Sequence, residues 1–220
     1  MNAHGEKHLL AIEDGIREST QSWREVLLNL KARGMNAPEL AIGDGAMGFW
    51  AAGEEIYSST RQQRCWCHKT RNGLNALPKS VQPKAKQVLH DIWRAETKGE
   101  AEQAFEGFLN TSDTKYPKAT ACLEQDREEL LMFYVFPAAH WLSLRTTNPI
   151  ESMFGTIRHR TARTKGCLTR DGMRHMMLKL GQCAEKTWRR LRGFKELPKV
   201  IAGIQFAEGM EQPTTDSVAA

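Results

Sequence analysis

The stretch of sequence that decides the fold is residues 38–50, PELAIGDGAMGFW. Pro38 leads into Leu40-Ala41-Ile42-Gly43, a short apolar run that is typical of a buried strand. Asp44-Gly45 ends this strand, and the residues from Met47 to Tyr57 have the character of a helix. A strand, a turn and a helix in this order predict an α/β unit in which a parallel partner strand follows.

The flanking sequence continues this alternation. His8 to Ile12 predicts an earlier strand, and Arg61 to Trp66 predicts a later one. Between them, Ser19 or Thr20 is expected to cap a helix that Gly34 ends. The apolar face of that helix recurs at helical spacing, at Trp23, Val26, Leu27 and Leu30. The first 70 residues therefore predict the order strand, helix, strand, helix, strand.

The middle of the chain has a different pattern. Helices are predicted at Lys84–Lys98, Ala101–Leu109 and Lys118–Phe133, with no strand signal among them. A further helix is expected from Thr147 to about Arg163, and a last helix from Arg170 to Leu191. The middle segment is therefore interpreted as a helical insertion in an α/β domain.

Composition limits the class of protein. Hydrophobic residues make up 40% of the 220 residues and charged residues 26%, which is ordinary for a globular domain. No apolar run approaches the roughly 18 residues that span a bilayer, and Met1 to Lys7 contains no secretion signal. The five cysteines form no evenly spaced set. These features predict a cytoplasmic protein with reduced thiols and no membrane partner.

Positive charge is concentrated near the C-terminal end. The net charge is +5, but residues 156–200 contain thirteen Lys and Arg against three Asp and Glu. This excess favours a polyanionic partner, and nucleic acid in particular. A solvated helical face is the alternative.

Two carboxylates stand at positions where ligands bind. Asp44 follows a predicted buried strand, and side chains at such strand ends project into the ligand crevice of open α/β sheets. The alternative is that Asp44 and Gly45 simply form a turn, since Asp-Gly pairs are common in turns. Glu151 lies three residues after Asn148, where a glutamate completes a capping box at a helix start. Local sequence alone leaves both interpretations of each residue open.

The cluster Cys65-Trp66-Cys67-His68 contains residue types that bind zinc. A structural zinc site needs four ligands, usually as two close pairs, and Cys122, Cys167 and Cys183 stand apart. Packing of Cys65 and Trp66 in a strand, with His68 at the strand end, is favoured over a zinc site.

A basic run follows Glu151 on the same predicted helix. It contains Arg158, Arg160, Arg163 and Lys165, which are candidates for holding DNA phosphates beside the carboxylate. A solvated helix face is again the alternative.

Four ordered blocks over about 150 residues resemble the Mutator-type transposases of bacterial insertion sequences. The blocks begin with Ser22-Trp23-Arg24 and residues 30–34, continue with residues 43–50 and 63–72, and end with residues 146–152 and their extension to Gly166. The resemblance implies a ribonuclease-H-like domain with a three-carboxylate site for two Mg²⁺ or Mn²⁺ ions. It implies that Asp44 and Glu151 are two of the metal ligands, and that Cys65 and His68 form the family's Cys-x-x-His element.

The resemblance also gives the expected activity and domain plan. Metal-dependent cleavage and transfer of DNA strands, acting on insertion-sequence ends and target DNA, is the implied reaction. The fold is expected to be an incomplete ribonuclease-H-like α/β domain with an all-helical insertion before the last catalytic helix. The segments are a partial core at 1–79, the insertion at 80–145, the glutamate-bearing and basic helices at 146–204, and a frayed tail at 205–220.

One departure from the family pattern bears on activity. The family's first aspartate lies on a central strand well upstream of the position of Asp44, and neither Glu13 nor Asp14 matches it. The chain is therefore expected to be a truncated transposase with little or no strand transfer of its own. The alternative is a catalytically inactive fragment that binds DNA or joins full-length transposase.

Overall fold

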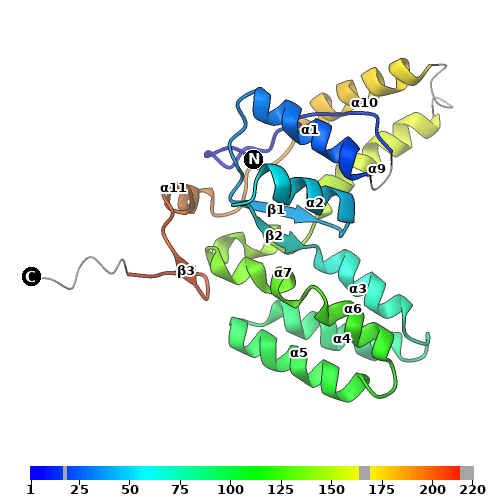
Figure 1. The fold of residues 1–220 in the computed structure, drawn as a ribbon, viewed down its shortest axis with the longest axis vertical. Helices are drawn as coiled ribbons and strands as arrows, with labels where there is room; N and C mark the ends of the chain where they lie inside the picture. Colours follow the sequence, from blue (N-terminus) through cyan, green and yellow to red (C-terminus); the bar gives the residue numbers. More distant parts are fainter. Residues whose placement is uncertain (17–18, 164–168, 214–220) are drawn as a thin grey trace, which may run out of the picture. The chain divides into compact units, whose positions relative to one another are not determined.

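The structure, a computed structural model, describes residues 1–16, 19–163 and 169–213 (Figure 1). The chain divides into two compact units, each built from segments that are far apart in sequence. The first unit comprises residues 1–39, 46–60 and 147–198. The second comprises residues 40–45, 61–146 and the chain from Lys199 onward.

The first unit is helical. Its helices α1 and α2 pack through a small core of Leu27, Leu30, Ala52 and Tyr57. Its helices are α1 (Thr20–Ala32), α2 (Met47–Ile56), α9 (Asn148–Arg163) and α10 (Arg170–Glu185), followed by a 3-10 turn at Phe194–Glu196.

Helix α1 begins and ends where the sequence predicts. The Ser19 hydroxyl accepts a hydrogen bond from the backbone N–H of Ser22, which caps the helix. At the other end Gly34 has φ +92°, and its N–H donates to the Lys31 carbonyl while the Met35 N–H donates to that of Leu30. This pair of bonds is a Schellman motif, which needs a left-handed residue, so glycine stops the helix here.

The strand expected at His8 to Ile12 does not form, and that prediction was wrong. Side chains of neighbouring helices bind this segment instead of a strand partner. Glu185 accepts hydrogen bonds from the His8 ring (2.8 Å) and from the Leu9 N–H (3.4 Å), and Arg33 donates to the Leu10 carbonyl (2.9 Å). Two backbone groups of this segment, the Leu9 N–H and the Leu10 carbonyl, thus bond to side chains and not to a β-ladder.

The second unit contains the parallel strand pair that the sequence predicts. Strand β1 (Leu40–Gly43) pairs with β2 (Arg61–Arg64), with Leu40 opposite Arg61 and Gly43 opposite Arg64. The chain connects them through α2. Strand β2 ends at Arg64, not at Trp66, because helix α3 starts there. Within the described residues, no third strand joins this sheet.

Helices make up most of the second unit, and residues 80–145 contain no strand, as predicted. The expected Lys118–Phe133 helix is broken at Gln125–Asp126. The helices are α3 (Trp66–Asn75), α4 (Gln82–Arg94), α5 (Lys98–Ser112), α6 (Pro117–Glu124), α7 (Arg127–Leu131), α8 (Trp141–Leu144) and α11 (Leu197–Ile201), with 3-10 turns at Met132–Val135 and Ala138–His140.

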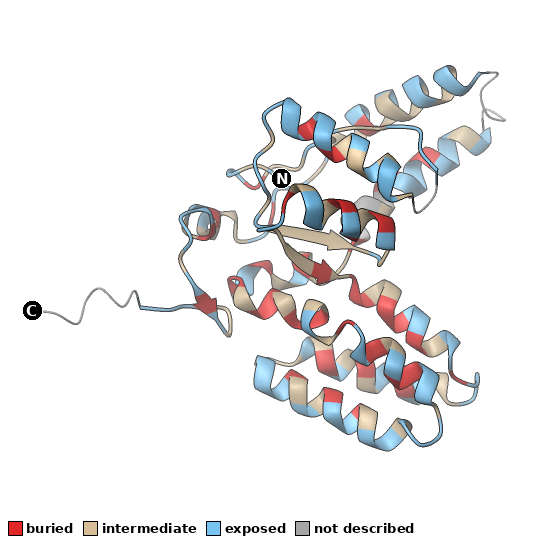
Figure 2. Ribbon diagram, in the orientation of Figure 1, coloured by how far each residue is buried: buried red, intermediate tan, exposed pale blue. Residues whose placement is uncertain are grey.

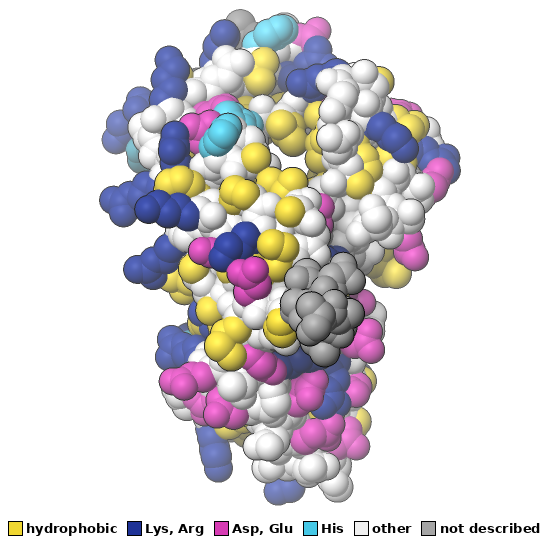
Figure 3. All heavy atoms as spheres, turned by 90° about the vertical axis from the view of Figure 1, so that its left-hand side faces the viewer, with side chains coloured by type: hydrophobic (Ala, Val, Ile, Leu, Met, Phe, Trp, Pro, Cys, Tyr) yellow, Lys and Arg dark blue, Asp and Glu magenta, His cyan; other side chains and the backbone are white. Residues whose placement is uncertain are grey.

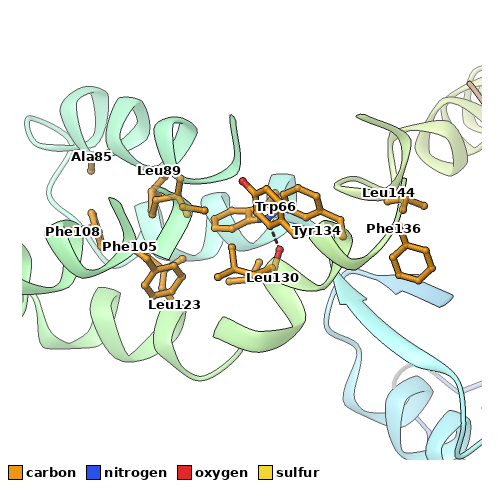
Figure 4. Packing of buried hydrophobic residues seen from close by; sticks show 14 of the residues in the cluster. Trp66, Ala85, Leu89, Phe105, Phe108, Leu123, Leu130, Tyr134, Phe136 and Leu144 are labelled. Carbon is orange, nitrogen blue, oxygen red and sulfur yellow. Dashed lines mark hydrogen bonds between the residues drawn. The ribbon is translucent and has the colours of Figure 1, made fainter. Parts of the chain in front are cut away.

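These helices enclose the larger core of the protein (Figure 2). Trp66 lies at its centre, fully buried, and its indole N–H donates to the Leu130 carbonyl over 2.8 Å. Figure 4 shows Leu89 and Tyr134 near this ring, with Phe105 and Leu123 further along the helices. The core therefore joins the end of the strand pair to the helical segment through α3.

Two terminal features differ from expectation. Helix α10 ends at Glu185 because the chain then turns back, with the Leu191 N–H donating to the Gly5 carbonyl over 2.8 Å. Within the predicted tail, β3 (Phe206–Ala207) and β4 (Met210–Glu211) form a hairpin, and residues 214–220 lie outside the described residues. Across the described part of the chain, no helix is both long and apolar enough to span a bilayer.

Candidate functional site

Asp44 is exposed at the carboxyl end of β1, in the second unit. The next residue, Gly45, has φ +110°, which only glycine adopts without strain. A Cβ atom at this position would lie 2.7 Å from Nη1 of Arg64. The turn that presents Asp44 is therefore fixed by a glycine packed under an arginine from the neighbouring strand.

That arginine belongs to a buried ion cluster. Nε of Arg64 lies 3.1 Å from Oδ2 of Asp126, and Nη2 donates to Oδ1 over 3.2 Å. Lys69 of α3 also bonds Oδ2 of Asp126. All three side chains are at most 15% exposed. One carboxylate thus holds two cations at the end of β2, and the cluster carries a formal charge of +1.

Sequence reasoning missed this cluster. Arg64 and Lys69 fall inside one of the blocks that carry the family resemblance, but Asp126 lies 62 residues after Arg64. Asp126 stands among several other acidic residues, and no local pattern distinguishes it. Only the break between α6 and α7, which places Asp126 in a turn, could have suggested a special role.

Cys65 and His68 lie in the second unit with Asp44. Cys65 is 1% exposed at the N-cap position of α3, and its N–H donates to the Gly43 carbonyl over 2.8 Å. His68 is half-buried within α3, not at a strand end as predicted. Among the described residues, no group of three or more His, Cys, Asp or Glu is arranged to hold a metal ion.

Glu151 is in the first turn of α9, in the first unit. The hydroxyl of Thr147 donates to Oε1 of Glu151 over 3.1 Å, and the Glu151 N–H donates to the Thr147 carbonyl. Thr147, not Asn148, therefore takes the N-cap position. The carboxylate is half-buried at a helix start, where the backbone N–H groups favour negative charge.

The predicted DNA-contacting arginines follow on the same helix. Arg158, Arg160 and Arg163 are exposed, while Met153 and Ile157 of the same helix are buried. Lys165 lies outside the described residues. Arg158 is seven residues after Glu151, about two helical turns or ~10 Å along the axis.

Part of the basic charge of α10 is neutralised. Arg170 forms an ion pair with Asp14 (2.6 Å), and Arg174 approaches Glu13 (3.5 Å). Both acids come from the N-terminal segment that the sequence predicted as a strand and its turn. The exposed arginines of α9 add further positive charge to the surface of the first unit.

The structure brings the predicted residues together in two groups. Asp44, Cys65 and His68 belong to the second unit, whereas Glu151 and the α9 arginines belong to the first. Asp44 and Glu151 are therefore not joined within either unit. Each provides carboxylate oxygens, which are the donors that hard divalent cations prefer.

Comparison with known proteins defines the class. A sequence model described as "Transposase, Mutator family" matches residues 1–188. The transposase for insertion sequence element IST2 of Acidithiobacillus ferrooxidans is 52% identical over 211 residues, which cover 96% of this chain and 71% of that protein. The transposase for IS6120 of Mycolicibacterium smegmatis is 47% identical over 97% of this chain and 67% of its own length.

A more distant relative, the transposase for ISRM5 of Rhizobium meliloti, is 32% identical over 71% of this chain and 39% of its own length. These matches define a class of insertion-sequence transposases. The chain belongs to the Mutator family of transposases. The resemblance predicted from the four sequence blocks is confirmed.

Proposed function

We propose that this chain carries part of the catalytic region of an insertion-sequence transposase that cleaves and transfers DNA strands with the help of Mg²⁺ or Mn²⁺. Membership of the transposase family carries the proposal. In this proposal the substrates are insertion-sequence ends and target DNA, and the chain acts in the cytoplasm. Its fold is ribonuclease-H-like, and residues 80–145 form the helical insertion.

Asp44 and Glu151 are proposed as two of the three carboxylates that hold the metal ions. Both are accessible oxygen donors at element ends, Asp44 after β1 and Glu151 at the start of α9. In this proposal the two residues form only part of the site, because the family resemblance assigns the third carboxylate to no residue of this chain. When bound, a pair of such ions activates the attacking hydroxyl and stabilises the leaving oxygen of a phosphodiester.

The other residues of the chain position the DNA. Arg158, Arg160 and Arg163 are exposed on the helix that begins beside Glu151, so they can bind phosphates on the strand next to that carboxylate. Gly45 and Arg64 hold the turn that presents Asp44. In this proposal these side chains orient the DNA strand and the Asp44 carboxylate.

Metal binding tests the ligand assignment directly. Mn²⁺ titration of the purified chain, followed by electron paramagnetic resonance, should show binding that Asp44→Asn and Glu151→Gln each weaken by about tenfold or more. Glu54→Gln, which changes an exposed carboxylate of α2, is the matched control. Equal Mn²⁺ affinity in all three variants would overturn the assignment.

Strand transfer tests the missing carboxylate. The chain alone is expected to join DNA ends at no more than background level with Mg²⁺. Robust Mg²⁺-dependent joining that Asp44→Asn abolishes would show that the chain holds a complete site after all.

A DNA-binding or regulatory module is the second candidate, favoured by the exposed arginines of α9. Such a module would bind DNA, or would join full-length transposase and reduce its activity. DNA binding that survives chelation of divalent metal and weakens steeply with salt supports the module. Loss of all DNA binding on chelation excludes it.

A further inference from the structure

A groove lies between α3 and α4 in the second unit, away from Asp44 in sequence and unassigned by the resemblance. Its volume is about 520 Å³. The lining residues are Trp66, Cys67, Thr70, Arg71, Leu74, Asn75, Gln82, Lys86, His90 and Trp93.

The groove is basic. Arg71 from α3 and Lys86 from α4 are exposed at its rim, and His90 lies half-buried beside them. No Asp or Glu is among the lining residues. The surface elsewhere on the unit differs, since acidic and basic side chains are mixed over the helices at the lower end of the view in Figure 3. A ligand of this groove therefore meets a single sign of charge.

The groove also holds a hydrogen-bonding group that the protein leaves unused. Thr70 is 7% exposed, and its buried hydroxyl oxygen has no hydrogen-bond partner in the part of the chain that the structure describes. A buried hydroxyl without a partner costs roughly 1–3 kcal/mol. A ligand oxygen that accepts a hydrogen bond from this hydroxyl would remove the cost.

Two further cations lie against the Trp93 side chain, which lines the groove. The guanidinium carbons of Arg145 and Arg94 lie 5.1 Å and 5.2 Å from the ring centre of Trp93, which forms one wall. Arg145 is half-buried, and burial lowers its pKa. Its Nη1 donates to the Trp93 carbonyl, and among the described residues its buried Nε has no hydrogen-bond partner. The positive charge of Arg145 adds to the positive field at this wall of the groove.

We propose that the α3–α4 groove binds the phosphodiester backbone of DNA, as a contact separate from the α9 arginines. The proposal rests on the proposed DNA-processing function. A phosphate presents negative charge to Arg71 and Lys86 and an acceptor oxygen to Thr70. Because the two strongest cations lie on the rim, the groove suits a polymer that runs past it and not a small enclosed ligand.

A charge-matched pair of double variants tests the groove. Arg71→Gln with Lys86→Gln removes two charges from it, whereas Lys79→Gln with Lys84→Gln removes two exposed charges from the same region that do not line it. Binding of a fluorescent DNA duplex by the full chain is measured by anisotropy over a range of salt concentrations.

The groove variant should bind about tenfold more weakly or worse at low salt. A plot of log affinity against log salt concentration should have a negative slope that is smaller in magnitude by about 2, as expected for the loss of two phosphate contacts. The control should change affinity by no more than about twofold. Equal losses in the two variants overturn the proposal, as does a failure of the unmodified chain to bind DNA at low salt.

Thr70→Val separates binding from folding. Valine has nearly the shape of threonine, and it removes a hydroxyl that lacks a partner, so thermal stability should stay the same or rise. DNA affinity should nevertheless fall by a fewfold. A loss of stability with unchanged affinity would contradict the role given to this hydroxyl.

Thiol protection gives a readout without any substitution. Cys67 lines the groove, while Cys122 on α6 is half-buried and does not line it. DNA should slow the alkylation of Cys67, measured by mass spectrometry, and leave Cys122 unchanged. Protection by millimolar inorganic phosphate but not by DNA would identify a small-anion site and overturn the DNA assignment.

These tests are independent of the catalytic proposal. Glu54→Gln, which changes an exposed carboxylate of α2 outside both proposed sites, should leave the DNA affinity, the salt slope and Cys67 protection as they are in the unmodified chain. If the groove readouts hold while Mn²⁺ binding is insensitive to Asp44 and Glu151, only the metal-ligand proposal fails.

Discussion

Arg64 and Asp126 form a two-point contact, with Nε 3.1 Å from Oδ2 and Nη2 3.2 Å from Oδ1, that joins the end of β2 to the turn before α7. Lys69 shares the same carboxylate. The geometry fixes the plane of the guanidinium beside Gly45, and so beside the turn that presents Asp44.

Asp126→Ala should destabilise the chain by about 3–5 kcal/mol, because it leaves two buried cations without their counter-charge. Urea unfolding followed by circular dichroism measures the change. Glu128→Ala removes an exposed acid two residues away and should change stability by less than about 0.5 kcal/mol. Similar midpoints for the two variants would show that the cluster contributes little.

Gly45→Ala should destabilise by about 1–3 kcal/mol, since the residue has φ +110° and the new Cβ meets Arg64. Gly107→Ala is the control, because it lies inside α5 with nothing within 4 Å of the added carbon. That change should stabilise by about 0.5–1 kcal/mol. Opposite shifts in the unfolding midpoint are expected, and shifts of the same sign would refute the strain at Gly45.

Glu151 variants separate a helix cap from a metal ligand. Glu151→Gln keeps an oxygen that accepts from Thr147, so stability should change by less than about 0.5 kcal/mol while Mn²⁺ affinity falls. Glu151→Ala loses both functions and should also cost about 1 kcal/mol. If Glu151→Gln keeps full Mn²⁺ affinity, the carboxylate acts only at the helix start.

His90 should make DNA binding depend on pH. Its pKa lies below the usual 6.5, first because of burial and then because Arg94 and Lys86 repel its charge, with Asp91 opposing them. Arg71 from α3 lines the same groove. Because the folded-state pKa is depressed, the stabilising contribution of neutral His90 is present above pH 6.5 and is lost as pH falls through the folded pKa.

A phosphate in the groove should reverse this effect and raise the pKa of His90, so DNA affinity should increase as pH falls below about 6.5. Proton NMR of the imidazole, with and without DNA, measures the shift. His90→Gln should flatten the pH dependence of binding. A His90 pKa that DNA leaves unchanged would place the phosphate elsewhere.

The isolated chain should unfold at low temperature or aggregate. Within the described residues its parallel sheet has only two strands, and such pairs are marginal by themselves. Several large apolar side chains are exposed, including Ile16 (78%) and Met47 (77%). Differential scanning calorimetry with light scattering tests this expectation, and a cooperative melt at high temperature would contradict it.

Local signals in the sequence predicted local structure well. Ser19 and Gly34 marked the ends of α1 because capping chemistry involves residues only a few positions apart. The apolar run at Leu40–Gly43 predicted β1, and the parallel pairing with β2 followed from the helix between them. The transposase family was predicted from the four sequence blocks together, because no single motif was specific enough to establish it.

Long-range contacts decided the features that sequence analysis missed. His8 to Ile12 has the composition of a strand, but Glu185 and Arg33 bind its backbone from helices that are distant in sequence. Arg64 could not be matched to Asp126 across 62 residues. The α3–α4 groove likewise depends on the packing of two helices, which periodicity alone does not specify.

The distance along the chain between Arg64 and Asp126 has a consequence for synthesis on the ribosome. Strands β1 and β2 can meet as soon as residue 64 has left the exit tunnel, but Arg64 and Lys69 remain hydrated until Asp126 emerges. The turn that carries Asp44 therefore acquires its final shape only after helices α4 to α6 have been translated. A nascent chain that stalls before that point would expose an unfinished strand end to chaperones and proteases.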